Sequence, residues 1–370
     1  MYYYDRNAYY RLQADIDLSG IQWSTAVIPV FGGDFDGNGH TIHNLMIDTA
    51  GANLVDLGLF GKIDGATAQV KNLGLENFNI MGGNYSSSIG GLCGQNYYGT
   101  IANCHTTGSV TGYYNLGDLC GYNLFGIINS CYTNGSVFGG DSSTDGGIGG
   151  LCGHNLRGTI TNCYATGSVS GPGSHIGGLV GEQHFGTIGG CYATSSVSGG
   201  NVAGGLSGIN NEGTIINSYA AGSVIGGGSL GGLSGGNSGT IDSSYATGSV
   251  TGNSNLGGLI GSNDGTITNS YATGSVTGDN KLGGLCGNNW YGLIINSYAT
   301  GLITGVINLG GLCGHQYGDT ATIVNSFWDT ETSTLLTGYN LDSSEPGTIT
   351  NVVGLQTDLM QTESTFTAAG

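Results

Sequence analysis

Short runs of Ile, Val, Leu and Thr, each closed by glycine, recur along most of the chain and predict β-strands joined by tight turns. The most regular landmark is the segment Gly-Gly-Leu-X-Gly, which returns in a constant order with the strands that follow it. Its leucines are Leu92, Leu119, Leu151, Leu179, Leu206, Leu233, Leu259, Leu285 and Leu312, with a weaker first copy at Leu59. Most copies are 26 to 28 residues apart, and two steps are lengthened to 32 and 33 residues.

A fixed period of this length over so many copies is typical of a solenoid. Three short strands fit into each period, and each strand can pair with its equivalent in the next period. One period cannot bury its own apolar face, whereas a stack of periods can. The sequence therefore predicts an all-β fold, a single-stranded parallel β-helix (solenoid) of about ten coils of 26–28 residues with an N-terminal cap.

The regular repeat does not extend to the ends of the chain. Residues 1–56 do not fit it and carry 7 of the 18 aspartates, so we expect an N-terminal cap and first coil there. Residues 57–330 hold the β-helix repeats. Beyond them the pattern decays, and residues 331–370 are expected to form a partial C-terminal cap or tail.

Aligned repeats place like residues in columns along the predicted rod. One column carries asparagine, with Gln183 and Gln316 as substitutes, and such amides hydrogen-bond from coil to coil. A tyrosine column runs from Tyr132 to Tyr298, and its rings are expected to stack. Cysteine and serine interchange in another column, which indicates a small, tightly packed position, with occasional disulfides as the alternative. Asp118 replaces a glycine, and we expect a solvated corner there, with a functional site as the alternative.

Composition excludes several classes of protein. Glycine supplies 76 of 370 residues and charged residues only 8%, which argues against a helical enzyme. Six Lys and Arg against 24 Asp and Glu give a net charge of −18, so we expect no nucleic acid partner and no anionic membrane partner. No apolar run approaches the ~18 to 20 residues of a membrane helix, so no membrane insertion is expected. The first residues lack the basic start and apolar stretch of a signal peptide.

The repeats resemble the GLUG motif of bacterial secreted and cell-surface proteins. A clear copy is the segment GGLIGSNDGTITNSYATGSV at residues 257–276, and about nine copies lie between residues 58 and 328. The resemblance implies an extracellular or cell-surface bacterial β-helix, often part of a large adhesin-like or protease-associated protein, with a signal peptide outside this sequence. It implies no catalytic residues, because the motif is structural.

Chemically distinctive side chains converge in the least regular repeats. The third position after the leucine is Tyr122, His154 and Glu182 in successive coils, so His154 and Glu182 should be neighbours. Adjacent columns add His184 and Arg157, and an imidazole beside a carboxylate can transfer protons. The predicted catalytic set is His154, Glu182, His184 and Arg157. Aromatic side chains for binding sugar rings would be Tyr97, Tyr98, Tyr122, Phe125 and Phe185.

Two functions from different classes fit this pattern. The first is a noncatalytic extracellular surface or adhesin-type module that binds glycan or protein through the irregular flank near residues 95–185. The alternative is a secreted polysaccharide-active enzyme, a lyase or a glycoside hydrolase, although no two acids share a column here as a hydrolase pair would require. A third interpretation is that these turns simply tolerate any side chain.

We expect no cofactor and no metal site, because zinc, phosphate-loop and EF-hand spacings are absent from the sequence. The dispersed aspartates leave weak binding of Ca²⁺ as an open alternative. The expected partners are a polysaccharide or cell-surface glycan, or another surface protein. Self-association end to end or side by side also fits, since open solenoid ends and flat faces can pair.

Overall fold

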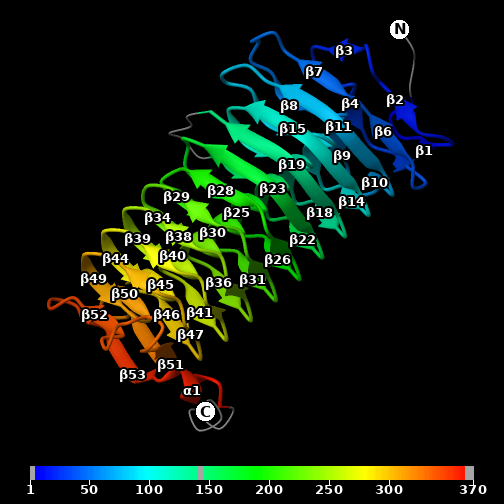
Figure 1. The fold of residues 1–370 in the computed structure, drawn as a ribbon. Helices are drawn as coiled ribbons and strands as arrows, with labels where there is room; N and C mark the ends of the chain where they lie inside the picture. The colour runs from blue at the N-terminus through cyan, green and yellow to red at the C-terminus, as the bar shows by residue number, and fades with distance from the viewer. Residues whose placement is uncertain (1–4, 141–145, 363–370) are drawn as a thin grey trace.

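The chain folds as an all-β parallel solenoid in a computed structural model that describes residues 5–140 and 146–362 (Figure 1). Coils stack from one end of the rod, drawn in blue, to the other, drawn in red, and equivalent strands of successive coils lie side by side. The ladders that join successive coils are parallel, as between β21 (Cys152–Leu156) and β25 (Val180–His184). The predicted fold class, a single-stranded parallel β-helix, is confirmed.

Three sheets run along the rod. The twelve-stranded sheet consists of β4 (Ile28–Phe31), β9 (Phe60–Asp64), β13 (Cys93–Tyr97), β17 (Cys120–Leu124), β21, β25, β30 (Ser207–Asn211), β35 (Ser234–Asn237), β40 (Ile260–Asn263), β45 (Cys286–Trp290), β50 (Cys313–Tyr317) and β52 (Tyr339–Leu341). The ten-stranded sheet consists of β8 (Val55–Leu57), β12 (Ser87–Gly90), β16 (Tyr114–Gly117), β20 (Ile148–Gly149), β24 (Ile176–Gly177), β29 (Val202–Gly204), β34 (Ser229–Gly231), β39 (Ser254–Gly257), β44 (Asn280–Gly283) and β49 (Ile307–Gly310).

The third sheet has 31 strands in three rows. Its first row is β1 (Tyr9–Arg11), β5 (Asp34–Asp36), β10 (Gln69–Lys71), β14 (Thr100–Ala102), β18 (Ile127–Asn129), β22 (Thr159–Thr161), β26 (Thr187–Gly189), β31 (Thr214–Ile216), β36 (Thr240–Asp242), β41 (Thr266–Thr268), β46 (Leu293–Ile295), β51 (Thr322–Asp329) and β53 (Thr348–Leu355). The second row is β2 (Ile16–Asp17), β6 (Thr41–His43), β11 (Gly74–Met81), β15 (His105–Gly112), β19 (Tyr132–Gly139), β23 (Tyr164–Gly171), β27 (Tyr192–Ala193), β32 (Tyr219–Ala220), β37 (Tyr245–Ala246), β42 (Tyr271–Ala272) and β47 (Tyr298–Ala299). The third row is β3 (Gln22–Trp23), β7 (Met46–Asp48), β28 (Ser196–Gly199), β33 (Val224–Ile225), β38 (Val250–Thr251), β43 (Val276–Thr277) and β48 (Ile303–Thr304).

The rod has about thirteen turns, because the first row of the 31-stranded sheet is thirteen strands deep. The predicted count of about ten coils was too low, and the difference lies at the two ends. There β1, β2 and β3 pair with β5, β6 and β7 before the leucine repeat begins. After it ends, β52 pairs with β50 and β53 pairs with β51. Backbone pairing therefore continues where the side-chain repeat has stopped.

Helical structure among the described residues is confined to α1 (Thr357–Met360). Four residues are far too few to span a bilayer, and the described residues form no membrane-spanning helix.

The core consists of apolar columns that repeat from coil to coil. The leucine column from Leu92 to Leu312 and the isoleucine column from Ile101 to Ile323 are both fully buried. At the corner before the Tyr column the backbone adopts positive φ, and asparagine occupies this position in most coils, for example Asn162 (φ 54°) and Asn269 (φ 51°). Asparagine tolerates this left-handed conformation better than most side chains, so the repeated Asn marks where the chain turns.

A buried amide ladder runs along the twelve-stranded sheet, as predicted. Each Asn Nδ2 donates to the amide oxygen of the next coil at 2.7 to 2.9 Å, and most donate as well to a backbone carbonyl of their own turn. The members are Asn96, Asn123, Asn155 and Gln183, then Asn210, Asn237, Asn263, Asn289 and Gln316. The ladder runs in two parts, because Gln183 Nε2 and Asn210 Oδ1 have no hydrogen-bond partner among the described residues. Within each part the linked amides hold the turns in register.

The tyrosine and cysteine columns also follow the predictions. Successive tyrosine rings from Tyr132 to Tyr298 lie 4.8 to 5.0 Å apart with planes within 6° of parallel. All nine cysteines are buried and free. The backbone N–H of Cys163 donates to the Cys191 thiol at 3.4 Å, and that of Cys191 donates to the Ser218 hydroxyl at 3.1 Å. A thiol and a hydroxyl thus accept the same hydrogen bond, which explains why Cys and Ser interchange in this column.

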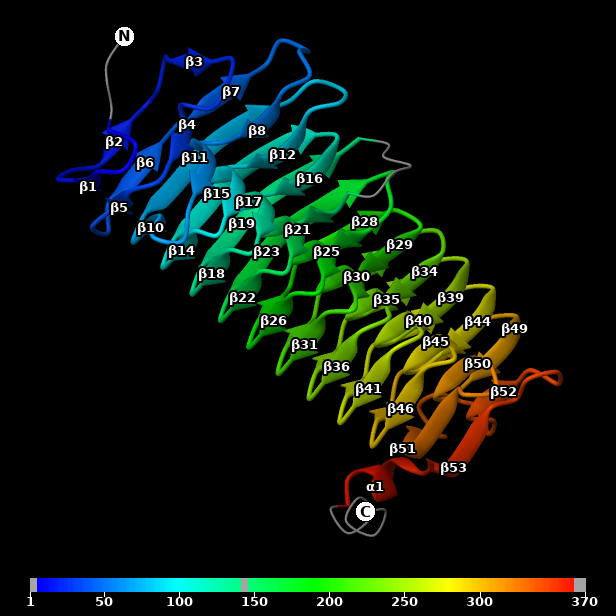
Figure 2. The same ribbon diagram turned by 180° about the vertical axis from the view of Figure 1, so that it is seen from behind.

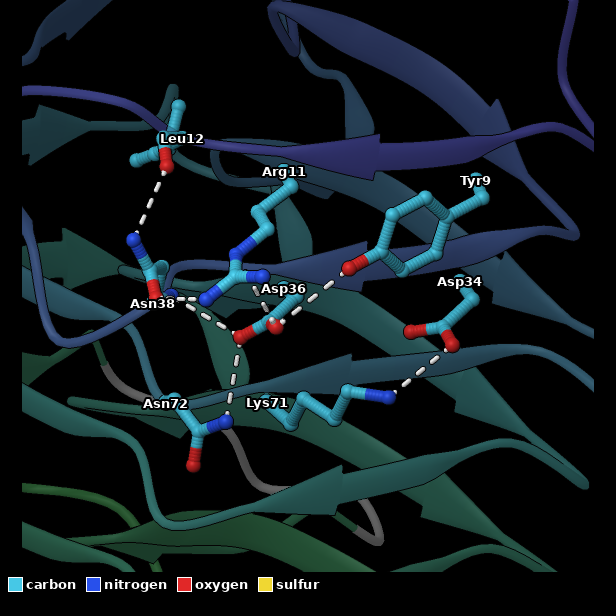
Figure 3. Close-up of polar contacts among 8 residues, drawn as sticks. All are labelled: Tyr9, Arg11, Leu12, Asp34, Asp36, Asn38, Lys71 and Asn72. Atoms are coloured by element: carbon cyan, nitrogen blue, oxygen red, sulfur yellow. Dashed lines mark hydrogen bonds and ion pairs between the residues drawn. The ribbon is translucent and has the colours of Figure 1, made fainter.

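Charged side chains hold the first turns together (Figure 3). Lys71 Nζ lies 2.9 Å from an Asp34 carboxylate oxygen, and Arg11 lies 3.8 Å from Asp36. The Asn72 side-chain amide donates to Asp36 at 3.0 Å, which lowers the pKa of that carboxyl. These contacts join β1, β5 and β10 across adjacent turns at the end where the leucine repeat is absent.

Asp118 is 1% exposed, so the predicted solvated corner is wrong. The Thr106 hydroxyl donates to its Oδ2 at 3.2 Å, whereas its Oδ1 has no hydrogen-bond partner among the described residues. Burial raises the pKa of Asp118 well above its usual value, more than the Thr106 hydrogen bond lowers it. The side chain therefore lies inside the rod chiefly as the neutral acid.

The amide ladder predicts a large effect from one internal substitution. Asn237→Ala should lower the free energy of unfolding by about 2 kcal/mol, because it leaves buried partners on Asn210 and Asn263 without their hydrogen bonds. Thermal unfolding followed by circular dichroism measures this loss. Asn253→Ala, in an exposed turn, is the matched control and should change the melting temperature little.

Asp118 predicts a pH-dependent stability. Its raised pKa means that the native state holds a proton that the unfolded state releases above about pH 4, so its contribution to stability falls as pH rises. Asp118→Asn removes this titration. The stability advantage of the variant should therefore grow between pH 4 and pH 8, by at most about 1.4 kcal/mol per pH unit. Exposed Asp279→Asn is the control, and an equal gain at both pH values would contradict the assignment.

Candidate functional site

The predicted site residues lie on the twelve-stranded sheet and on the corner that follows it. Figure 2 shows β17, β21, β25 and β30 as successive strands of one column. His154 pairs in register with Glu182 across β21 and β25, and Tyr122 pairs with His154 across β17 and β21. The predicted adjacency of His154 and Glu182 is confirmed.

Four side chains form what we call the imidazole cluster: His154, His175, Glu182 and His184. The Glu182 carboxylate lies at its centre, with His184 Nε2 at 3.2 Å, His175 Nδ1 at 3.7 Å and His154 Nδ1 at 3.9 Å. Glu182 is 2% exposed, whereas the three imidazoles are partly exposed. A buried carboxylate is therefore surrounded by rings that reach the surface.

Opposing effects act on the ionisation of Glu182. Burial raises the pKa of its carboxyl, but contact with His175 and the fields of His154 and His184 outweigh burial and leave the pKa below its usual value. Glu182 is thus a carboxylate at neutral pH. Tyr122 lies 5.0 Å from the His154 ring, and burial, then the Glu182 charge, raise the pKa of its phenol.

An exposed row on the corner after the twelve-stranded sheet, here called the aromatic corner, contains Tyr98, Phe125, Arg157 and Phe185. Tyr98 and Phe125 stack at 4.8 Å with planes 7° apart. The Arg157 guanidinium lies 6.0 Å from the Phe125 ring centre and 5.1 Å from that of Phe185, which is the geometry of cation–π contacts. The corner presents three rings and one cation to solvent.

The structure therefore divides the predicted catalytic set. His154, Glu182 and His184 come together, but Arg157 lies on the aromatic corner and makes no ion pair with Glu182 among the described residues. Of the predicted binding residues, Tyr97 contacts the corner edge-on through Tyr98 at 4.6 Å. Tyr122 belongs instead beside the imidazole cluster.

Backbone geometry at the aromatic corner is unfavourable for large side chains. Tyr98, Phe125, Arg157 and Phe185 all have φ between 50° and 59°. This left-handed conformation costs an L-residue roughly 1–2 kcal/mol, and glycine or asparagine would avoid most of that cost. Bulky residues are uncommon in this conformation, so the corner is a candidate for a function of its side chains.

Sequence reasoning missed His175 as a member of the imidazole cluster. It lies in the turn between β23 and β24, outside the strand columns, so column register gave no indication of its neighbours.

A second missed feature, the C-terminal pocket, is a cavity of about 320 Å³ lined by Lys281, Asn288, Trp290, His315, Tyr317 and Asp342. Trp290 is 48% exposed, and its ring stands at 87° to that of Tyr317 at 5.7 Å. The register of Trp290 with Tyr317 was readable from the repeat, but Asp342 follows β52, beyond the last repeat.

Comparison with known proteins identifies the repeat. The GLUG motif matches residues 85–111, 144–170, 172–198, 252–277 and 278–304. Halomucin from Haloquadratum walsbyi is 40% identical over 121 residues, which span 29% of this chain and 1% of halomucin.

Among solved structures, a "putative immunoglobulin A1 protease" from Bacteroides ovatus aligns with a TM-score of 0.48 and 25% identity. The alignment covers 59% of this chain and 70% of that protein. The five motif matches lie on coils of the rod described above, and they form two adjacent pairs, 144–170 with 172–198 and 252–277 with 278–304. The chain thus carries GLUG repeats on a rod that is folded as a parallel β-solenoid.

Proposed function

We propose that this chain is a noncatalytic module of an extracellular or cell-surface protein and that it binds glycan along the edge of the twelve-stranded sheet. One observation carries the proposal: exposed aromatic side chains gather on this edge. Tyr98, Phe125 and Phe185 are 42%, 38% and 48% exposed, and Trp290 and Tyr291 are 48% and 45% exposed farther along the rod. Exposed aromatic rings are the side chains that contact the apolar faces of sugars.

The two ends of this edge suit different contacts. In the aromatic corner Tyr98 and Phe125 cover each other's faces, so the corner offers ring edges and the Arg157 guanidinium. In the C-terminal pocket, Trp290 and Tyr317 stand perpendicular beside Lys281, Asn288 and Asp342, so apolar walls meet hydrogen-bonding groups. We therefore expect a sugar ring to be held in the pocket and a longer chain or a protein to extend toward the flank at residues 95–185.

The comparisons support a place outside the cell. The relative with 40% identity is named halomucin, and mucins are extracellular proteins. The GLUG repeats of this chain resemble repeats in secreted and surface proteins. The net charge of −18 also argues against a nucleic acid partner.

The alternative function, a lyase or glycoside hydrolase, receives less support from the geometry. Glu182 is buried beneath three imidazoles, and Asp118, the other described acid between residues 77 and 211, contacts Thr106 instead. A hydrolase needs two carboxyl groups that flank the scissile bond, roughly 5 to 9.5 Å apart. The described part of this flank offers no such accessible pair.

Glycan binding is tested by retention of the purified chain on immobilised neutral and anionic polysaccharides. Trp290→Ala should weaken the retained complex about tenfold, equivalent to about 1.4 kcal/mol of lost ring contact. The double variant Phe125→Ala, Phe185→Ala should weaken it less, since those rings offer mainly their edges. Phe138→Ala removes a ring that is 52% exposed on β19, away from this edge, and is the matched control. Absence of retention on every polysaccharide would contradict the proposal.

The noncatalytic assignment predicts no new chain ends when the same polysaccharides are incubated with the protein. Reducing ends and unsaturated ends are measured separately, because hydrolases produce the former and lyases the latter. New ends that disappear in Glu182→Gln but persist in the distant Glu76→Gln would instead establish an enzyme centred on the imidazole cluster.

A further inference from the structure

The imidazole cluster contains a buried charge whose hydrogen bonds are incomplete. Glu182 is 2% exposed, and its Oε2 accepts no hydrogen bond among the described residues. The imidazole nitrogens beside Oε2 are His175 Nδ1 at 3.7 Å and His154 Nδ1 at 3.9 Å, both beyond hydrogen-bond length. A carboxylate buried in this way is costly unless a positive charge or donor compensates it.

The protein supplies no permanent cation to this carboxylate. Among the described residues, no Lys or Arg forms an ion pair with Glu182, and Arg157 contacts the Phe125 and Phe185 rings instead. The other buried polar side chains of the same sheet are uncharged amides, such as Asn155 and Gln183, and serine hydroxyls. Among the described residues of this sheet, Glu182 is therefore the buried side chain that carries a charge.

The geometry around Glu182 is close to that of a metal centre. One ligand atom from each of His154, Glu182 and His184 lies within 4.8 Å of the others. Zinc bonds to nitrogen and oxygen are about 2.0 to 2.2 Å long, so ligand atoms around a bound ion are roughly 3.5 Å apart. The His154 and His184 rings are already nearly perpendicular, with centres 5.5 Å apart. Small side-chain rotations would close the site without moving β21 or β25.

We propose that His154, Glu182 and His184 bind a divalent transition-metal ion of the zinc type. Two imidazole nitrogens and one carboxylate oxygen suit Zn²⁺ and its first-row neighbours, whereas Ca²⁺ and Mg²⁺ prefer oxygen ligands throughout. His175 lies next to the same carboxylate and is placed to supply the fourth ligand. The Asn211 side-chain amide now contacts His184 Nε2, and the metal ion would displace it.

This site goes beyond glycan binding, since metal binding needs no polysaccharide. The ion would join strand β21 of one coil to β25 of the next and, through His175, to the turn between β23 and β24. It would therefore act as a cross-link between coils in the least regular part of the rod. A metal that binds only the folded state also stabilises that state.

The test is calorimetric titration of the full chain, first stripped with EDTA, with ZnCl₂ alone. We expect one equivalent to bind, and we expect Glu182→Gln and His154→Gln each to weaken binding at least tenfold. Glu76→Gln is the matched control, because Glu76 also lies between two imidazoles, His43 at 3.6 Å and His105 at 3.3 Å, but is 41% exposed. It should keep the affinity of the unaltered chain.

Two further measurements identify the type of ligand and check that the variants are folded. Co²⁺ in place of Zn²⁺ should give a spectrum without the near-ultraviolet band of a thiolate ligand, because the proposed ligands are imidazoles and a carboxylate and include no thiol. Far-ultraviolet circular dichroism checks that each variant is folded, and if Glu182→Gln is not, His154→Gln and His184→Gln decide. No saturable binding, equal binding by the folded variants, or a thiolate band would overturn the proposal.

Discussion

Hydrogen bonding between successive coils, in constant register, is the constraint on which the rest of this structure depends. Backbone N–H groups donate along the rod, as from Leu233 to the Leu259 carbonyl at 2.9 Å, so each coil is bonded to its two neighbours. Each side chain then lies directly above its equivalent, about 4.8 Å away. Only residues that tolerate a copy of themselves at that distance can fill a column. Stacked tyrosines, linked amides and interchangeable thiols and hydroxyls are three solutions to this requirement.

Carboxylates have no such solution, because like charges one coil apart repel each other. Two of the three buried acids among the described residues, Asp118 and Glu182, avoid this repulsion in different ways. Asp118 has its pKa raised by burial and lies inside the rod as a neutral acid beside Thr106. Glu182 has its pKa lowered despite burial, because its neighbours are the imidazoles of His175, His154 and His184 and not further acids. Ionisation inside the rod therefore requires a local break in the repeat, and that break is where a site can form.

Sequence periodicity predicted the features that strand register determines. It placed His154 beside Glu182, aligned the amides and tyrosines, and gave the fold class, because a fixed step along the chain becomes a fixed position on the rod. It failed where geometry depends on something other than register. The end turns pair without the leucine repeat, and His175 approaches Glu182 from a turn whose length differs between coils. The burial of Asp118 depends on which side of the corner its side chain enters, which a column of glycines does not reveal.

The stacking of coils also makes length a discrete variable in this molecule. Phe185 and Tyr291 occupy equivalent corner positions four repeats apart, since Leu206, Leu233 and Leu259 mark the coils between them. Losing or duplicating one repeat of 26 or 27 residues would move the two aromatic groups by one strand spacing of about 4.8 Å and leave both on the same edge. Gain or loss of whole repeats would thus change the distance between the two aromatic groups in fixed steps. The contacts that each group makes would stay the same.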